Sequence, residues 1–317
     1  MNNYSPILVM TLCRSEHFKK CISSLSNCRD AKKSDLYIAL DHPFSESHWT
    51  GYNIILGYIK NIEGFRSVNL IKRDVNFGAL KNFKDAVDQI FQKYDRCIIS
   101  EDDNYFSKNF LEYINNGMDK YFDRKDIFSI NGYSYRIKIP ENYNNNLYLW
   151  KGFSAWGFGI WKDRWDMIEG DLDSNRCFEN VSDYLSDYKN IFDLNKVASH
   201  YFPSLLRMLQ VKEVIGDAYF SMYMIKNNMY CIFPVISKVR NFGHDGSGVH
   251  SNAQAKDLYE SQEIDYNDTF KFNDEIDEAN FEINSILKSH FKRGFKNKFK
   301  TMLFYFKYLI NRYVLKI

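Results

Sequence analysis

The chain has 317 residues and a mass of 37.7 kDa, which is large for a single domain. Hydrophobic residues make up 45% of it and charged residues 26%, a composition that excludes a disordered or collagen-like chain. The 42 Lys and Arg residues against 40 Asp and Glu residues leave a formal charge of +2. This balance argues against a nucleic-acid partner, which usually needs a strongly basic surface, so any electrostatic partner should bind locally.

The six cysteines form no CxxC pair and no metal-site spacing, and they are few for a disulfide scaffold, so a reducing compartment is predicted. The N-terminus lacks the basic segment, apolar core and cleavage site of a signal peptide. The longest apolar run, 302–310, is interrupted by Lys307 and is shorter than the ~20 residues that a membrane-spanning helix needs. We therefore expect a cytoplasmic protein that begins at Met1 and does not cross a membrane.

Short aliphatic runs alternate with helical patterns over the first 130 residues. A helix is predicted over 76–94, because its apolar residues recur every three or four positions. Strands separated by helices in this way predict right-handed crossovers and a mainly parallel sheet. The predicted strands are Ile7–Leu12, Leu36–Leu40, Val68–Ile71, Cys97–Ser100 and Ile127–Ile130.

Beyond about Pro140 the pattern changes to Gly- and aromatic-rich segments that differ from the strand and helix units before them. We place a change of subdomain at this point. Three parts of the chain are expected, namely 1–140, 141–282 and 283–317.

Polar side chains follow several predicted strands. Glu101, Asp102 and Asp103 come directly after the fourth strand, while Arg14 and Asp41 follow the first two. Ligands of parallel α/β sheets bind beyond the carboxyl ends of the strands, so these residues are expected to share one site. A hard divalent cation would relieve the repulsion among the three carboxylates and bridge them to phosphate oxygens. The alternative is a solvated acidic turn ahead of a helix near 107–121.

Asp217 begins an apolar stretch with helical periodicity, where a helix-capping role would explain it. The alternative is a general base. A carboxyl beside an aromatic wall, formed by Tyr219, Phe220 and Trp156, could accept a proton from an acceptor hydroxyl.

A glycine-rich loop, 240–250, follows the apolar run 230–236. Its glycines let backbone N–H groups approach oxyanions, and Arg240 and His244 would supply positive charge to a departing phosphate. An ordinary turn is the alternative, because Gly, Ser and Asp clusters also form turns.

The segment 286–317 holds nine Lys and Arg residues and no Asp or Glu. The periodicity predicts an amphipathic helix that lies on an anionic membrane surface. The alternative is a helix that docks on the core of the protein, with its lysines in water. The periodic apolar residues are Phe291, Phe295, Phe299, Met302, Phe306, Leu309 and Tyr313.

The chain resembles the GT-A nucleotide-sugar glycosyltransferases, most closely the family of N-acetylglucosaminyltransferase I and its bacterial relatives. The resemblance spans about residues 5–252 and is carried by an ordered set of segments. It implies a Rossmann-like GT-A fold with a smaller acceptor-side part. The segments are PILVMTLCRSEHFKKCISSL, LYIALDHP, CIISEDDNYFSKNFLEYI, FSAWGFGIWKDRW, GDAYF and PVISKVRNFGHDGSGVHS.

The resemblance implies roles on the donor side. Arg14 and Asp41 match the positions that hold the uridine and its phosphates. Glu101 would face the donor sugar, Asp102 the ribose, and Asp103 a metal ion, Mn²⁺ or Mg²⁺, that bridges the diphosphate.

On the acceptor side, the resemblance implies that Asp217 is the catalytic base of an inverting enzyme. The loop from Arg240, with His244, would close over the donor, and Trp156 would belong to the sugar and acceptor pocket. The motif GDAYF departs from the aspartate pair flanked by tryptophans that the family carries, which leaves the acceptor open. The basic C-terminus looks like the peripheral anchoring of bacterial enzymes that extend lipid-linked surface glycans.

The expected function is transfer of a sugar, GlcNAc or a related hexose, from a UDP-sugar to a hydroxyl of an oligosaccharide or lipid-linked glycan. The expected setting is bacterial polysaccharide or lipopolysaccharide synthesis at the inner face of the cytoplasmic membrane. Residues 1–140 would bind the nucleotide sugar, 141–282 would bind the acceptor and carry the base, and 283–317 would form the basic helix. One alternative is a nucleotidyltransferase, although no Gly-rich loop follows the first strand. The other is a catalytically silent binding protein of the same fold.

Overall fold

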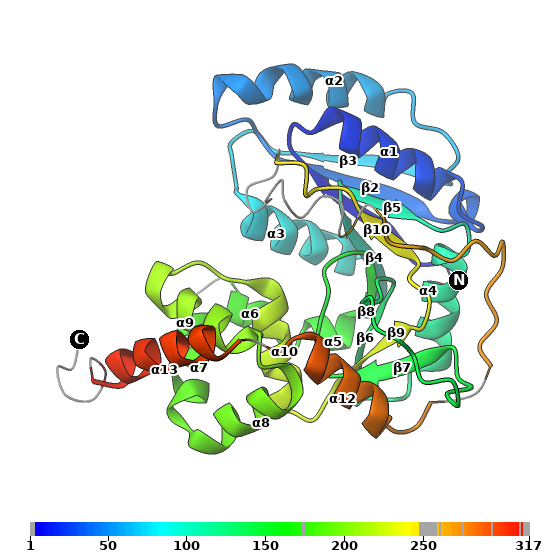
Figure 1. Ribbon diagram of the computed structural model, residues 1–317. Helices are drawn as coiled ribbons and strands as arrows, with labels where there is room; N and C mark the ends of the chain where they lie inside the picture. Colours follow the sequence, from blue (N-terminus) through cyan, green and yellow to red (C-terminus); the bar gives the residue numbers. More distant parts are fainter. Residues whose placement is uncertain are drawn as a thin grey trace.

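A computed structural model describes residues 4–172, 175–246, 259, 261–273, 276–292, 294–310 and 312. Its centre is an eight-stranded sheet with the order β3-β2-β1-β4-β8-β6-β9-β7 (Figure 1). Neighbours are parallel from β3 to β4 and between β6 and β9, whereas β8 and β7 run antiparallel to their neighbours. The strands of this sheet are β1 (Ile7–Thr11), β2 (Asp35–Leu40), β3 (Ser67–Lys72), β4 (Arg96–Glu101), β6 (Ile127–Asn131), β7 (Leu147–Trp150), β8 (Phe158–Trp161) and β9 (Tyr230–Pro234).

Helices cover both faces of the sheet, and alternate residues of each strand feed two cores. In β1, Ile7 and Val9 pack into the core under α1, α2 and α4, whereas Leu8 joins the core shared by α3 and the helices α7–α10. Figure 1 shows α1 and α2 on one side of β1–β3 and α3 on the other. The helices are α1 (Ser15–Ser26), α2 (Trp49–Ile59), α3 (Ala79–Phe91), α4 (Phe110–Lys120), α5 (Lys162–Trp165), α6 (Glu169–Leu172), α7 (Arg176–Ser186), α8 (Tyr188–Ala198), α9 (Tyr201–Val211), α10 (Gly216–Lys226), α12 (Phe281–His290) and α13 (Phe295–Ile310), with short 3-10 turns at Ala31–Lys33 and Glu46–His48.

The predicted α/β class with a mainly parallel central sheet is confirmed. The five predicted strands correspond to β1, β2, β3, β4 and β6, and the predicted helix over 76–94 contains α3. Of the strands beyond Pro140, β7, β8 and β9 join the same sheet as β1–β4, whereas β10 (Val239–Asn241) does not.

A second, two-stranded sheet pairs β5 (Asn104–Phe106) with β10 (Val239–Asn241) in antiparallel register. Asn241 lies opposite Asn104, so the loop that follows β10 comes back to the acidic turn that follows β4. This small sheet is the element that assembles the site described below.

The C-terminal segment forms two helices where one was expected. α12 ends at His290, and Phe291 at its C-cap stacks on Trp150, with ring centroids 5.4 Å apart. Gly294 precedes α13, and a glycine between two helices favours a break in the helical backbone. Of the described helices, none combines the length and the apolar character required to traverse a bilayer.

Candidate active site

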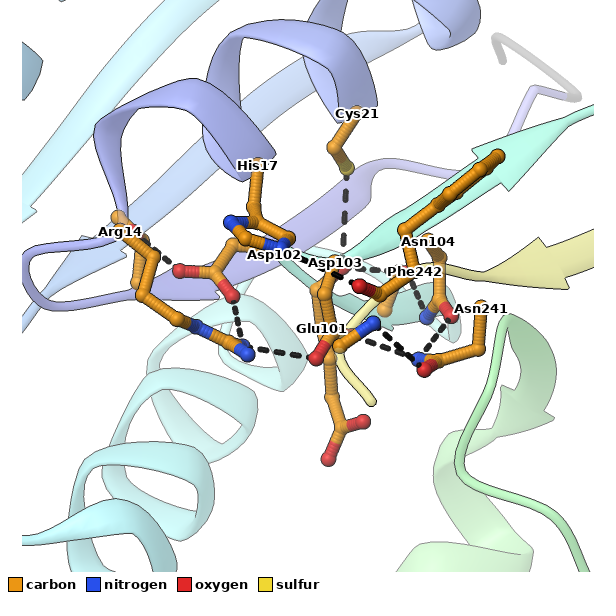
Figure 2. A network of polar contacts seen from close by, with 12 residues as sticks. Arg14, His17, Cys21, Glu101, Asp102, Asp103, Asn104, Asn241 and Phe242 are labelled. Carbon is orange, nitrogen blue, oxygen red and sulfur yellow. Dashed lines mark hydrogen bonds and ion pairs between the residues drawn. The ribbon is translucent and has the colours of Figure 1, made fainter. Parts of the chain in front are cut away.

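Arg14 lies between β1 and α1 and bridges two carboxylates of the acidic turn. Its Nη2 donates to Asp102 Oδ1 and lies 2.8 Å from Asp103 Oδ2 (Figure 2). Thr11, at the end of β1, donates to Asp102 Oδ2 at 2.7 Å. Although burial lowers it, the charges of Asp102 and Asp103 raise the pKa of Arg14, so the guanidinium stays charged. These contacts form because β1 and β4 are parallel neighbours whose carboxyl ends meet.

Asn241, at the end of β10, holds the opposite side of Asp103. Its Nδ2 donates to Asp103 Oδ1 at 2.8 Å, and the Phe242 backbone N–H donates to the Asp103 carbonyl at 2.8 Å (Figure 2). A Cβ on Gly243 would lie 2.0 Å from Asp103 Oδ2. A larger residue would therefore displace the Asp103 carboxylate, and the glycine permits this close approach.

Glu101 ends β4 and leaves this network. Figure 2 shows its side chain extending away from the Arg14 guanidinium. Burial raises the pKa of Glu101 well above its ordinary range, and the charges of Asp103 and Asp217 raise it further. Because Coulomb interactions weaken with distance, both carboxylates lie near Glu101. The fold therefore brings the acidic turn and Asp217 into one region.

Asp217 is the second residue of α10 and does not cap it, because the N-cap position is Ile215. Burial raises the pKa of Asp217 to about 7, and the Ala155 backbone N–H partly offsets this rise. Burial, with the charge of Asp217 nearby, also raises the pKa values of Tyr135 and Tyr201. A half-buried carboxyl with a pKa near neutrality is suited to proton transfer.

The aromatic surroundings of Asp217 include two residues that the sequence did not indicate, while one predicted member, Tyr219, has another partner. Tyr135 and Tyr201 lie there, and both hydroxyls donate to the Phe153 carbonyl, at 3.2 and 2.9 Å. The Tyr219 hydroxyl instead donates to Asp171 Oδ2 at 2.9 Å. Helical geometry explains why Tyr219 does not face Asp217, because residues two positions apart on a helix point in different directions.

Asp41 organises the loop before α3. Its Oδ1 accepts from the N–H groups of His42 and Phe77, at 2.9 and 2.8 Å. Its Oδ2 accepts from the Gly78 N–H at 2.9 Å and from Asn76 Nδ2 at 3.2 Å. Because four donors already occupy this carboxylate, Asp41 acts here as a positioning residue for the loop 76–78.

Arg240 contacts the backbone outside the acidic turn, and its predicted role toward a leaving phosphate stays a prediction. Its Nε donates to the Gln262 carbonyl at 2.5 Å. Its neighbours Val239 and Asn241 are 0% and 2% exposed, and alternate residues of a strand point to opposite faces. Asn241 therefore occupies the inward face of β10, where its side chain contacts Asp103.

His244 and Trp156 belong to one aromatic cluster beside the acidic turn. The His244 ring stacks on Tyr259 with centroids 4.2 Å apart, and Trp156 contacts both rings edge-on. Burial lowers the pKa of His244. The charge of Asp103 partly offsets this change, which indicates that the two side chains lie near each other. The later part of the predicted loop, 247–250, lies outside the described residues.

The acidic turn offers few oxygen ligands to a cation. Across the described parts of the chain, no three His, Cys, Asp or Glu side chains are arranged to hold a metal ion. Mg²⁺ is nevertheless often bound by one or two carboxylates, with phosphates and water as its other ligands. Asp103 Oδ2 could serve as one such carboxylate ligand. It lies beside Gly243, and a bound cation would share this oxygen atom with Arg14.

Three site residues, Thr11, Asn241 and Gly243, were not singled out from the sequence. Thr11 carries a weak signal, because it is a polar residue at the end of an aliphatic strand. Asn241 could be found from the alternation in Val239-Arg240-Asn241, once that segment is known to be a strand. The contact between Asn241 and Asp103 could not be predicted, because it joins residues 138 positions apart.

No family model matches the chain, and no curated protein matches it. Among solved structures, it is similar to S. aureus TarS at 14% identity and a TM-score of 0.32, over 46% of this chain and 24% of that one. It is also similar to the mannosyltransferase PcManGT from Pyrobaculum calidifontis in complex with GDP-Man and Mn²⁺, at 10% identity and a TM-score of 0.36, over 56% and 53% of the two chains. Mouse xyloside xylosyltransferase 1 in its apo form follows at 12% identity and a TM-score of 0.32, over 56% and 74%. The chain thus spans about a quarter of TarS and half of the mannosyltransferase, and likenesses of this size do not bear on activity.

Proposed function

We propose that the protein is an inverting glycosyltransferase that moves a sugar from a nucleotide diphosphate sugar to a glycan hydroxyl. The observation that carries the proposal is the meeting of two acidic sites at Glu101, whose pKa is raised by burial and by the charges of Asp103 and Asp217. One site is fixed by Arg14 and suits a diphosphate with its cation, and the other holds a carboxyl with a pKa of about 7. The donor is proposed to be a UDP-sugar, with GlcNAc or a related hexose, as the resemblance to the N-acetylglucosaminyltransferase I family implies.

In the proposed reaction, Asp217 accepts the proton of the acceptor hydroxyl as that oxygen attacks the anomeric carbon. The bond from the anomeric carbon to the diphosphate oxygen breaks, and the nucleotide diphosphate leaves with the electron pair. Attack from the side opposite the leaving group inverts the anomeric centre. Deprotonated Asp217 is needed for this step, so a pKa of about 7 leaves it available at neutral pH.

On the donor side, Arg14, Asn241 and Gly243 fix Asp103 in place. Asp103 would hold Mn²⁺ or Mg²⁺, which supplies positive charge to the departing diphosphate. Asp102 would face the ribose, and Glu101, which points out of the network, would face the donor sugar. His244 and Trp156 would line the same pocket beside the sugar.

The test compares two variants by calorimetry with UDP, with and without Mn²⁺, and by product formation across several UDP- and GDP-sugars. Asp217→Asn should keep UDP binding and lose transfer, whereas Asp103→Asn should lose metal-dependent binding and turnover. Asp268→Asn is the matched control, because its side chain is 73% exposed and pairs with Lys108 and not with the acidic turn or Asp217.

Full transfer activity in both variants would contradict the assignments. Preference for a nucleoside triphosphate over UDP would point to a nucleotidyltransferase. Metal-dependent UDP binding without transfer to any offered acceptor or water would favour a silent binding protein.

We further propose that the protein works at an anionic membrane surface through α13. One face of this helix docks on the protein, and the other is available to a membrane. Tyr305 docks inward, where its hydroxyl donates to the Leu185 carbonyl at 2.7 Å. The opposite face presents apolar residues at helical spacing: Phe299, Met302, Leu303, Phe306 and Ile310 are 41% to 56% exposed.

This placement is tested by sedimentation with anionic vesicles. The double variant Leu303→Gln/Phe306→Gln should bind about tenfold or more weakly, because it removes two side chains that would enter the membrane. Phe44→Gln/Phe192→Gln is the matched control, since these residues are also exposed, at 68% and 58%. Equal binding of the two double variants would contradict the placement.

A further inference from the structure

A cavity lies between α8, α9, α12 and α13, and none of the residues of the acidic turn lines it. Its volume is about 490 Å³. Its lining combines cationic and hydroxyl side chains with one exposed methionine of α13. The lining residues are Asn195, Ser199, Phe202, Ser285, Lys288, Ser289, Lys292, Lys298, Thr301 and Met302.

Three lysines bring uncompensated positive charge to this cavity. Lys288 lies in the last turn of α12, Lys292 follows that helix, and Lys298 lies in the first turn of α13. No Asp or Glu lines the cavity, and within the described chain no carboxylate pairs with any of the three. Because these lysines are exposed and no acidic side chain lines the cavity, a bound anion would gain favourable electrostatic interactions there.

The hydroxyl groups narrow the chemistry of that anion. Ser199, Ser285 and Ser289 lie among the lysines and can donate to oxygens. A terminal phosphate has three acceptor oxygens and up to two negative charges, and it forms strong charge-assisted hydrogen bonds with such donors. A carboxylate has two acceptor oxygens and one charge, so it would satisfy fewer of them.

The position of the cavity indicates where the phosphate comes from. Met302 belongs both to the cavity lining and to the exposed apolar face of α13. Phe299 and Phe306 continue that face, so an acyl chain that leaves the cavity past Met302 would stay on apolar surface. A free phosphate would make no use of this continuity.

We propose that the cavity binds the terminal phosphate headgroup of a membrane lipid. The proposal rests on the membrane placement of α13 proposed above and is independent of glycosyl transfer. Lys288, Lys292 and Lys298 neutralise the phosphate, the serine hydroxyls donate to its oxygens, and Met302 contacts the first part of the lipid tail. The site would fix which side of the protein faces the membrane.

The experiment measures binding of the full chain to phosphatidylcholine vesicles that contain either phosphatidic acid or phosphatidylserine, matched in surface charge. The wild type should prefer phosphatidic acid. Lys288→Gln/Lys292→Gln/Lys298→Gln should lose that preference, as should Ser289→Leu, which narrows the cavity without a change of charge. The matched control is Lys296→Gln/Lys300→Gln/Lys307→Gln, which removes three exposed lysines of α13 outside the cavity.

General attraction to an anionic surface contributes about fivefold in affinity per lysine. Its loss should therefore weaken binding of both triple variants to both kinds of vesicle by the same factor. Only a headgroup site makes the cavity variants lose about tenfold more on phosphatidic acid than on phosphatidylserine. Equal losses for the two triple variants would overturn the proposal.

Calorimetry with inorganic phosphate separates the two sources of phosphate. Tight binding of inorganic phosphate to the cavity, without a preference for phosphatidic acid vesicles, would overturn the lipid source. A wild type that binds neither vesicle would overturn both this site and the membrane placement. Donor turnover by the same variants should stay at the wild-type rate, so a failure here is distinct from a failure of the transferase proposal.

Discussion

Two carboxylate sites lie close together in this protein, and they are built in opposite ways. Asp102 and Asp103 share the Arg14 guanidinium, and Thr11 and Asn241 donate to them as well. Asp217 has a single backbone donor, Ala155, and burial raises its pKa to about 7. Burial raises the pKa of Asp102 as well, but Arg14 and Thr11 lower it there, whereas only the Ala155 N–H lowers that of Asp217.

The comparison shows how one region of the protein can hold carboxylates with different chemistry. A cationic partner lowers the pKa of a buried carboxyl and favours its charged form, whereas a carboxyl without such a partner, Asp217, has a pKa of about 7. The first site suits binding and the second suits proton transfer. Variants that remove or add partners should therefore change the two sites in different directions.

The largest expected effect comes from removal of the shared cation. Arg14→Met should lower the free energy of unfolding by about 3–5 kcal/mol, because two buried carboxylates lose their partner. Urea unfolding at pH 7 measures the change, and Arg14→Lys should recover part of it. A loss below that of an ordinary surface variant would show that Arg14 does not hold the site together.

Removal of the charge at Asp217, which has no cationic partner, should instead raise the free energy of unfolding. The ordinary Asp pKa of 3.8 is raised to about 7 in the folded protein, so charged Asp217 opposes folding at high pH. Asp217→Asn should therefore stabilise the protein by roughly 2–4 kcal/mol above pH 7, and the gain should disappear as the pH falls toward 4. Urea unfolding across this pH range measures the gain, and a gain that grows on acidification would contradict the assignment.

The same pKa predicts how activity depends on pH. In the wild type, kcat/KM should rise as Asp217 loses its proton and should level off above a midpoint of about pH 7. A pH–rate profile with a soluble acceptor measures this midpoint. A flat profile through pH 7 would show that Asp217 is not the base.

A smaller effect is expected where the backbone meets the compensated site. Gly243→Ala places a Cβ 2.0 Å from Asp103 Oδ2 and should cost about 1–3 kcal/mol through overpacking, with a parallel loss of donor affinity. Gly57→Ala is the control, because nothing lies within 4 Å of its Cβ in α2. Calorimetry measures the donor affinity of both variants, and equal affinities would contradict this prediction.

The smallest effect is expected from the arginine that points outward. Arg240→Gln should change donor binding by no more than about 0.5 kcal/mol, because its guanidinium meets the Gln262 carbonyl and not the acidic turn. Asn241→Ala on the inward face should weaken binding more, and calorimetry with UDP compares the two. A larger loss in the Arg240 variant would restore the original assignment.

The sequence by itself determined the elements whose signal is local. Aliphatic runs separated by turn residues identified β1, β2, β3, β4 and β6, and the spacing of apolar residues identified α3. It also placed Arg14 and the acidic turn at strand ends, where parallel strands meet. These features depend on short stretches of chain, so each stretch carries its own evidence.

Only the tertiary structure decided which side chains meet. The inward residue of β10 is Asn241 and not Arg240, because pairing with β5 sets the register of a strand of three residues. The periodic stripe of the C-terminal segment likewise divides, with Phe291 stacked on Trp150 and Phe299 exposed on α13. Strand pairing and helix docking join residues more than a hundred positions apart, and a local pattern contains no information about such partners.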